Sequence, residues 1–140
     1  MYLRYYFDGG GKSVRPCIAL CVGQLANYHN GNLGDQEERL RRQKMVAIVS
    51  EMIHTASLVH DDILDHAETR RGKESINVKW DTRKSTMGGD YILAVGSRLL
   101  SQVGDKEVVV ILSQVLADLV QGEFMQLQNK EDESERFKAD

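Results

Sequence analysis

The sequence of 140 residues has few cysteines, a single proline and no excess of one charge sign, and each shortage excludes a class of protein. Two cysteines, Cys17 and Cys21, cannot build a disulfide framework or a complete metal site, so we expect them to pack as small apolar side chains. The 18 Lys and Arg residues nearly balance the 21 Asp and Glu residues, which argues against a nucleic-acid partner. We expect no segment long and apolar enough to span a bilayer, and residues 1–7 do not have the pattern of a cleavable targeting peptide. The length is sufficient for one domain with its own core.

What the sequence does contain is helical periodicity, which predicts an all-α protein. The only proline, Pro16, fits the first turn of a helix that ends near Tyr28, because proline is tolerated there. Asp35 and Glu38 have the spacing of a helix N-cap and its reciprocal partner. The helical pattern then continues to about His66.

Further helices are expected over residues 82–103 and 106–128, and another from Ser134 onward. The first of these contains three glycines, which weaken a helix in water and therefore indicate close contact with a neighbouring helix. They are Gly88, Gly89 and Gly96.

The helix expected over residues 35–66 has two different faces. One is apolar and recurs at three- and four-residue steps, through Met45, Val49, Met52, Ala56, Val59 and Ile63. The other, called here the polar stripe, is small or polar throughout and consists of Ala47, Ser50, His54, Ser57, Asp61 and Asp65. Such a pair of faces predicts a helix that borders a cavity, although an ordinary solvated face has a similar composition.

Carboxylates and guanidiniums gather at the end of that helix. Asp61 and Asp65 are four residues apart, so both side chains project from one face and can bind the same divalent cation. Magnesium takes hard oxygen ligands, usually one or two carboxylates together with phosphate oxygens. Arg70 and Arg71 follow, and their planar guanidiniums match phosphate oxygens. The group indicates a diphosphate held through divalent cations, whereas an isolated motif of this kind fits a charged, solvated helix end equally well.

A second candidate anion site lies near the N-terminus. Gly9, Gly10 and Gly11 allow a tight turn and a close approach of the backbone to a ligand. Lys12 and Arg15 then stand at the start of an apolar helix, where free amides and the helix dipole favour an anion. The spacing is not that of a P-loop. By itself the run fits a glycine-rich connector with two incidental cations equally well.

Taken in order along the chain, these motifs resemble the trans-isoprenyl diphosphate synthases. The resemblance covers essentially the whole chain and rests on the ordered set of motifs rather than on any one of them. The set consists of Gly10-Gly11-Lys12-x-x-Arg15-Pro16, Asp61-Asp62-x-x-Asp65, Arg70-Arg71-Gly72, Asn77-x-x-Trp80, Gly89-Asp90-Tyr91-Ile92-Leu93-Ala94 and Gln121-Gly122-Glu123-Phe124. Residues 51–60 and 118–124 are similar to the long-chain synthases that make the ubiquinone tail, the solanesyl or decaprenyl diphosphate synthase subunit 1 type. The resemblance implies an isoprenoid-synthase-type helical bundle.

The resemblance also implies a reaction and a role for each motif. Enzymes of this kind condense isopentenyl diphosphate with an allylic diphosphate, such as farnesyl or geranylgeranyl diphosphate, into a long-chain trans-polyprenyl diphosphate. By resemblance, Asp61 and Asp65 bind Mg²⁺ with Asp62 beside them, and Arg70 contacts the allylic diphosphate. The diphosphate of isopentenyl diphosphate would be held by Lys12, Arg15, His54 and Arg71.

Two further assignments concern the surroundings of that site. Glu123 and Gln126 stand where the family has polar residues that face the metal cluster, although a plain polar helix face fits them as well. Ala56 and Ser57 stand where short-chain members have bulky aromatic residues that close the product pocket. Because both are small, the resemblance implies an open pocket and a long product.

The chain also departs from the family. The family's second aspartate-rich motif, and the lysine-threonine pair before it, are absent from this sequence. We therefore expect residues 1–140 to be the N-terminal portion of a single polyprenyl synthase domain, inactive alone, either by truncation or as a short gene product. The family implies a homo- or hetero-oligomer with another prenyl synthase subunit, in the mitochondrial matrix, or in the cytoplasm if the source is bacterial. Asp81 is a lesser departure, because a glycine usually follows the tryptophan there.

Two other functions stay open at the level of the sequence. The first is a non-catalytic subunit that modulates chain length beside an intact partner, against which the retention of Asp61 and Asp65 argues. The second is a class I terpene cyclase, which shares the aspartate motif. Lys12 and Arg15 argue against the cyclase, because a cyclase has no isopentenyl diphosphate to hold.

Overall fold

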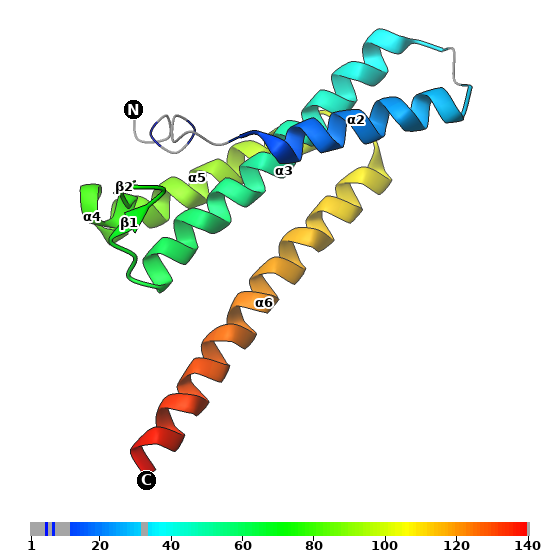
Figure 1. The fold of residues 1–140 in the computed structure, drawn as a ribbon. Helices are drawn as coiled ribbons and strands as arrows, with labels where there is room; N and C mark the ends of the chain where they lie inside the picture. Colours follow the sequence, from blue (N-terminus) through cyan, green and yellow to red (C-terminus); the bar gives the residue numbers. More distant parts are fainter. Residues whose placement is uncertain (1–4, 6, 8–11, 32–33, 140) are drawn as a thin grey trace. The chain divides into compact units, whose positions relative to one another are not determined.

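A computed structural model describes residues 5, 7, 12–31 and 34–139, with side chains as far as residue 129. The elements are α2 (Val14–His29), α3 (Gln36–Leu64), β1 (Thr69–Arg70), β2 (Lys73–Glu74), α4 (Ile76–Trp80), α5 (Thr82–Ser101) and α6 (Lys106–Ala139) (Figure 1). The contacts divide the chain into two units, residues 1–104 and 105–140, and each unit is described by itself. The predicted helical fold is confirmed, with one short antiparallel hairpin added to it.

The predicted starts of the first two long helices agree with the structure. Pro16 lies in the first turn of α2, and the Asp35 side chain accepts a hydrogen bond of 3.1 Å from the backbone N–H of Glu38 at the start of α3. The reciprocal half of the predicted cap is wrong. The Glu38 carboxylate instead accepts hydrogen bonds of 2.6–2.8 Å from Arg41 and Arg42, one turn further along the helix. Two guanidiniums attract a carboxylate more strongly than a neutral N–H does.

The core of the first unit lies between α3 and α5. Ala56 and Val59 of α3 are fully buried against Ile92 of α5, and full burial of a side chain such as Val or Ile contributes about 1.5–3 kcal/mol. Gly89 and Gly96 allow the close approach that their positions predict. A Cβ built on Gly89 would overlap the imidazole of His60, so a larger residue there would require the His60 side chain to move. The α5 backbone thus comes close to the end of α3 at this position.

Helix α2 packs on α3 but leaves most of its own apolar side chains in solvent. None of its residues is buried, and Val14, Ile18, Val22 and Leu25 are exposed by 52–66%. The expectation that the two cysteines, at positions 17 and 21, pack as small hydrophobic residues is wrong, because both thiols are free and exposed. They belong to the face of α2 that is turned away from α3.

The second unit is one long helix. The prediction of a separate helix from Ser134 is wrong, because α6 runs without a break from Lys106 to Ala139. Residues 128–134 contain neither glycine nor proline, so nothing in them ends a helix. The prediction that no segment could span a bilayer is also wrong by length and composition. Within the described residues, an 18-residue window of Lys106–Asn129 has a mean hydropathy of 1.6, although a single such helix is weak evidence because core helices of soluble bundles have the same composition.

Candidate functional site

The two arginines that follow the aspartates lie on a hairpin that the sequence reasoning missed. Arg70 pairs with Lys73 across β1 and β2, and the two-residue loop between them has φ angles of 52° at Arg71 and 76° at Gly72. Positive φ at both loop residues is the geometry of a type I′ turn, which matches the twist of paired strands. Two-residue strands of polar residues carry no hydrophobic alternation, so the only available signal was Gly72 in a short polar run. The hairpin places one guanidinium on a strand and the next in a tight turn.

Short hydrogen bonds fasten the base of the hairpin to the end of α3. The Ala67 carbonyl accepts bonds from the Ser75 hydroxyl at 2.5 Å and from the Asn77 side chain at 3.0 Å, and the Ala67 N–H donates to the Asp62 carbonyl at 2.9 Å. Ser75 is 1% exposed. Asn77 of the Asn77-x-x-Trp80 motif thus holds the segment that joins α3 to the hairpin.

A buried ion pair connects the middle aspartate to the first arginine. Asp62 is 1% exposed, and Nε of Arg70 donates to its two carboxylate oxygens at 2.7 and 2.8 Å. The sequence places Asp62 beside the metal ligands as a catalytic group. The structure turns its carboxylate towards Arg70, so Asp62 sets the position of that guanidinium from inside the protein.

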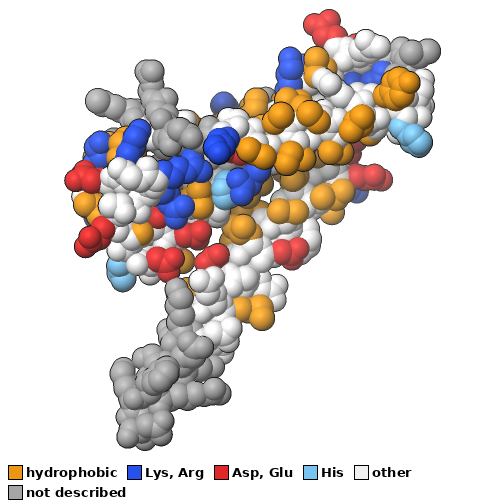
Figure 2. Space-filling model, in the orientation of Figure 1, with side chains coloured by type: hydrophobic (Ala, Val, Ile, Leu, Met, Phe, Trp, Pro, Cys, Tyr) orange, Lys and Arg blue, Asp and Glu red, His pale blue; other side chains and the backbone are white. Residues whose placement is uncertain are grey.

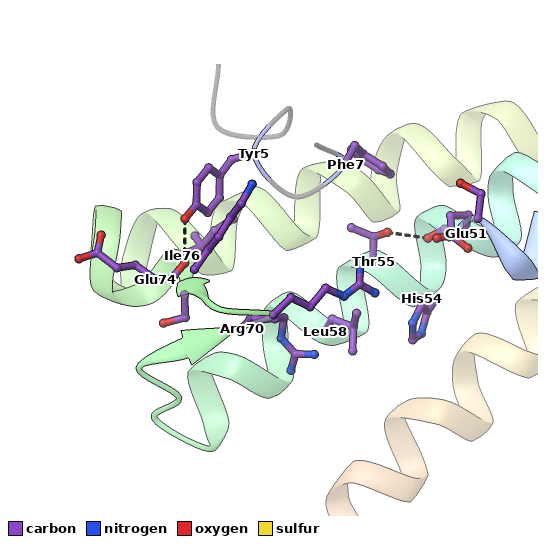
Figure 3. A pocket seen from close by; sticks show the side chains of 13 residues that line it. Tyr5, Phe7, Glu51, His54, Thr55, Leu58, Arg70, Glu74 and Ile76 are labelled. Carbon is purple, nitrogen blue, oxygen red and sulfur yellow. Dashed lines mark hydrogen bonds between the residues drawn. The ribbon is translucent and has the colours of Figure 1, made fainter. Parts of the chain in front are cut away.

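A small pocket lies between the N-terminal segment, α3 and the hairpin (Figure 3). Its volume is about 110 Å³, below the roughly 300–1,000 Å³ of pockets that take whole drug-sized ligands, so it suits a compact group. Its lining includes Tyr5, Phe7, Ser13, Glu51, His54, Thr55, Leu58, Arg70, Arg71 and Lys73. Figure 2 shows basic side chains gathered on the face that carries the hairpin. A larger hollow of about 520 Å³, between α2 and α3, has Arg39 as its only cation among the described lining residues.

Two guanidiniums of the hairpin line the pocket with His54, and the charge of Arg15 on α2 also acts on its imidazole. Burial lowers the pKa of the His54 imidazole, and Arg15 of α2 lowers it further. Arg71 and Arg70 act in the same direction, while Glu51 raises the pKa. His54 is therefore a neutral hydrogen-bonding group among three permanent cations. Such an arrangement favours a ligand that carries several negative charges.

The polar stripe of α3 borders the pocket at one residue only. His54 lines it, but the other α3 residues of the lining, Glu51, Thr55 and Leu58, lie beside the stripe. Within the stripe, the Ser57 hydroxyl donates to the His54 carbonyl at 2.9 Å, so its polarity is satisfied inside the helix. The pocket therefore adjoins the stripe only at His54, and the cavity expected along the rest of the stripe stays a prediction.

Asp61 and Asp65 stand at the C-terminal end of α3. Burial raises the pKa of Asp61, and Asp65 and Asp62 add to the rise, while Arg70 opposes it. Oδ1 of Asp61 is buried without a hydrogen-bond partner. The described residues contain no cluster of three or more metal-ligating side chains, so an ion here would need further ligands from phosphate or water. Two carboxylates completed by phosphate oxygens are the donor set that Mg²⁺ uses, so the residues fit this ion.

The remaining predicted site residues lie elsewhere or outside what the structure describes. Lys12 is exposed just before α2, and the glycines at positions 9–11 lie outside the described residues. Ala56 is in the α3–α5 core. Glu123 is half-buried and Gln126 is exposed on α6, in the second unit, so their relation to the aspartates stays a prediction.

The pocket is lined by guanidiniums and lies on the helix that ends in Asp61 and Asp65, an arrangement whose chemistry suits a phosphorylated ligand. Comparison with known proteins makes this specific. The chain belongs to the polyprenyl synthetase family, whose model matches residues 1–139. It is 47% identical to the all trans-polyprenyl-diphosphate synthase PDSS1 of Mus musculus over 95% of this chain and 32% of that protein.

Solved structures agree with this family. Heptaprenyl diphosphate synthase from Staphylococcus aureus matches with a TM-score of 0.76 and 34% identity, over 89% of this chain and 37% of that one. A polyprenyl synthase from Caulobacter crescentus, complexed with calcium and isoprenyl diphosphate, matches with a TM-score of 0.75 and 28% identity, over 90% of this chain and 35% of that one. The chain thus spans about a third of the length of these relatives.

Proposed function

We propose that this chain forms the diphosphate-binding part of a long-chain trans-polyprenyl diphosphate synthase, which joins isopentenyl diphosphate to an allylic diphosphate. The observation that carries the proposal is that His54, Arg70 and Arg71 line one pocket, beside the helix that ends in Asp61 and Asp65. Membership of the polyprenyl synthetase family supports it. So does the isoprenyl diphosphate in the solved Caulobacter relative.

The chemistry requires binding of two diphosphates and stabilisation of the one that leaves. When the allylic carbon–oxygen bond ionises, negative charge grows on the departing diphosphate, and fixed cations nearby lower the barrier. Asp61 and Asp65 would hold Mg²⁺, which would supply Lewis-acid stabilisation of that charge. Arg70 contacts the same diphosphate from the hairpin. Lys12, Arg15, His54 and Arg71 hold the diphosphate of isopentenyl diphosphate.

Asp62 has a supporting role in this scheme. A free arginine side chain is flexible, and holding it in one rotamer costs conformational entropy at the moment of binding. The buried carboxylate of Asp62 grips Nε of Arg70 before any ligand arrives. The guanidinium is thus already oriented, which raises affinity by reducing the entropy lost on binding.

The metal half of the proposal is tested by thermal unfolding. A non-hydrolysable farnesyl diphosphate analogue with Mg²⁺ should raise the melting temperature of this chain, because a ligand at 100 times its Kd stabilises the folded state by about 2.7 kcal/mol. The pair of substitutions Asp61→Asn and Asp65→Asn should abolish the rise, whereas Glu68→Gln, an exposed carboxylate nearby, should leave it intact. A cooperative melt that neither ligand nor Mg²⁺ shifts would contradict the proposal for this chain.

The proposed binding of diphosphate by the arginines is tested at the hairpin turn, by calorimetric titration with pyrophosphate. Arg71→Asn removes a cation but keeps a residue type that tolerates positive φ, so the turn should persist. We expect affinity to fall about tenfold or more, the value of one charge-assisted hydrogen bond. Arg83→Gln, which removes an exposed cation from α5, is the control and should bind like the unmodified chain. Equal affinity in both variants would exclude Arg71 from the site.

The proposal extends to assembly and location. A relative from Bacillus subtilis carries the name heptaprenyl diphosphate synthase component 2, which supports pairing with another prenyl synthase subunit. Similarity to PDSS1 and to decaprenyl diphosphate synthase subunit 1 supports a product for the ubiquinone side chain, made in mitochondria. Co-expression with a candidate partner, followed by gel filtration and a prenyl-transfer assay, tests the pairing and the product.

A further inference from the structure

Tyr5 connects the N-terminal segment to the hairpin through both its hydroxyl and its ring. The hydroxyl donates a hydrogen bond of 3.0 Å to the backbone carbonyl of Glu74 on β2. The ring meets the Trp80 ring edge-on, with centroids 5.1 Å apart and planes at 89°. Edge-on pairs of this kind contribute beyond the area that they bury. Tyr5 therefore contacts both β2, the second strand of the hairpin, and α4, the helix that follows it.

Two cations flank the same ring. The Lys79 ammonium lies 4.0 Å from the Tyr5 ring centroid, and that of Lys73 lies 5.8 Å from it. A negative ring face attracts an ammonium group, so the ring holds two like charges near each other. Tyr5 and Lys73 both line the cationic pocket (Figure 3 shows Tyr5 beside the hairpin and across from α3).

We propose that Tyr5 is a positioning residue for the anion pocket, which holds the hairpin and its cations in the geometry that binds a diphosphate. The inference rests on the proposed function, because it assigns Tyr5 to the same pocket. The path of action is short. Tyr5 fixes the Glu74 carbonyl, β2 pairs with β1, and β1 carries Arg70 next to the turn that carries Arg71. Without Tyr5 the hairpin keeps its attachment to α3 but loses its second support.

The chain contains its own reporter for this contact. Trp80 is the only tryptophan, and its indole touches the Tyr5 ring and lies 5.1 Å below the Lys79 ammonium. Its fluorescence therefore reports the Tyr5 contact with no competing signal. An anion that draws Lys73 away from the Tyr5 ring changes the surroundings of Trp80, so pocket occupancy should alter its emission.

The experiment titrates the chain with inorganic pyrophosphate and follows both calorimetric heat and Trp80 emission. In the unmodified chain we expect the emission to change in parallel with binding. Tyr5→Leu should weaken binding by about tenfold and abolish the emission change, since it removes the hydrogen bond, the ring pair and the cation contacts. Tyr5→Phe retains the ring, so it should keep the emission change and weaken binding by about threefold.

Matched controls separate this role from general stability. Tyr28→Leu removes a tyrosine that is 89% exposed at the far end of α2, and should behave like the unmodified chain. Circular dichroism checks that each variant keeps its helices. Unchanged pyrophosphate affinity in folded Tyr5→Leu would overturn the positioning role and leave the proposed function standing. Absence of pyrophosphate binding in every chain, including the unmodified one, would overturn both.

Discussion

The two ends of α3 carry ion pairs of the same chemistry in opposite surroundings. Near the first turn, Glu38 meets Arg41 and Arg42 at 2.6 and 2.8 Å, with side chains that are 35–51% exposed. Near the last turn, Asp62 meets Arg70 at 2.7 Å, with exposed fractions of 1% and 31%. The distances are nearly equal. What differs is the solvent around each pair and the length of chain that it joins.

The comparison shows that a short ion pair is not by itself a structural support. The two guanidiniums lower the pKa of Glu38 to about 2, but solvent screens the attraction and the residues already belong to one helix. Asp62 and Arg70 are eight residues apart, on a helix and a strand, and the carboxylate has no access to water. Loss of Arg70 there would remove the ion-pair partner that offsets the burial of this carboxylate. The ion pair at the candidate-site end of α3 thus joins two elements, whereas the pair at the other end joins residues of one helix.

The largest expected effect comes from breaking the buried pair. Asp62→Asn keeps the shape of the side chain but removes its charge. It should lower the free energy of unfolding by about 1.5–3 kcal/mol, the range for a hydrogen bond to a charged group, since the Arg70 that is left behind is partly exposed. Glu38→Gln at the other end of α3 should leave stability unchanged within error. Urea titrations of both variants make the comparison. An equal loss of unfolding free energy in the two variants would show that burial does not make one ion pair contribute more to stability than the other.

A smaller effect is expected at Asp81, an exposed carboxylate where backbone strain replaces burial as the deciding factor. Asp81 caps α5 by accepting from the Lys84 N–H at 2.9 Å, but its φ and ψ of 80° and 155° lie in a region that only glycine adopts readily. Asp81→Gly should raise the melting temperature by about 2–4 °C, because relief of strain exceeds the small cost of a glycine cap. Asp81→Ala should lower it, since it loses the cap and keeps the strain. Calorimetry of the two variants gives the sign of each change.

The smallest effect concerns Asp61, next to the buried pair. Burial raises its pKa, so the folded state binds a proton that the unfolded state releases first. Stability from this group is fully present below pH 3.8, its ordinary pKa, and is lost as the pH rises through the folded value. Asp61→Asn should therefore stabilise the chain at pH 7 by a few tenths of a kcal/mol, a value reduced by partial solvation. The gain should vanish at pH 3, and melting curves at the two pH values test this.

Sequence reasoning predicted the long helices well and the pocket poorly. Asp35 and Pro16 are local signals, and the starts of α2 and α3 agree with them. The hairpin could not be predicted from periodicity, because its strands are two residues long and polar. The pocket depends on that hairpin and on Tyr5, which lies 69 residues from its partner Glu74. No local pattern encodes such a contact.

The motifs predicted residue types better than residue roles. Asp61, Asp62 and Asp65 were treated as one carboxylate cluster, since one sequence run contains all three. On the helix, Asp62 points inward to Arg70 and is buried, while Asp61 is half-buried and Asp65 is exposed. Which member of a run turns inward depends on the element that packs against it, and that element was the missed hairpin.

The left-handed backbone at Arg71 has a consequence for protein engineering. The turn disfavours a side chain of this size at φ 52° and accepts glycine or asparagine more readily. A selection for thermal stability alone would therefore replace Arg71 early and reward the change. The selected proteins would be more stable to heat but would lack one cation of the proposed anion site. A library that varies residue 71 therefore needs a screen for ligand binding as well as for stability.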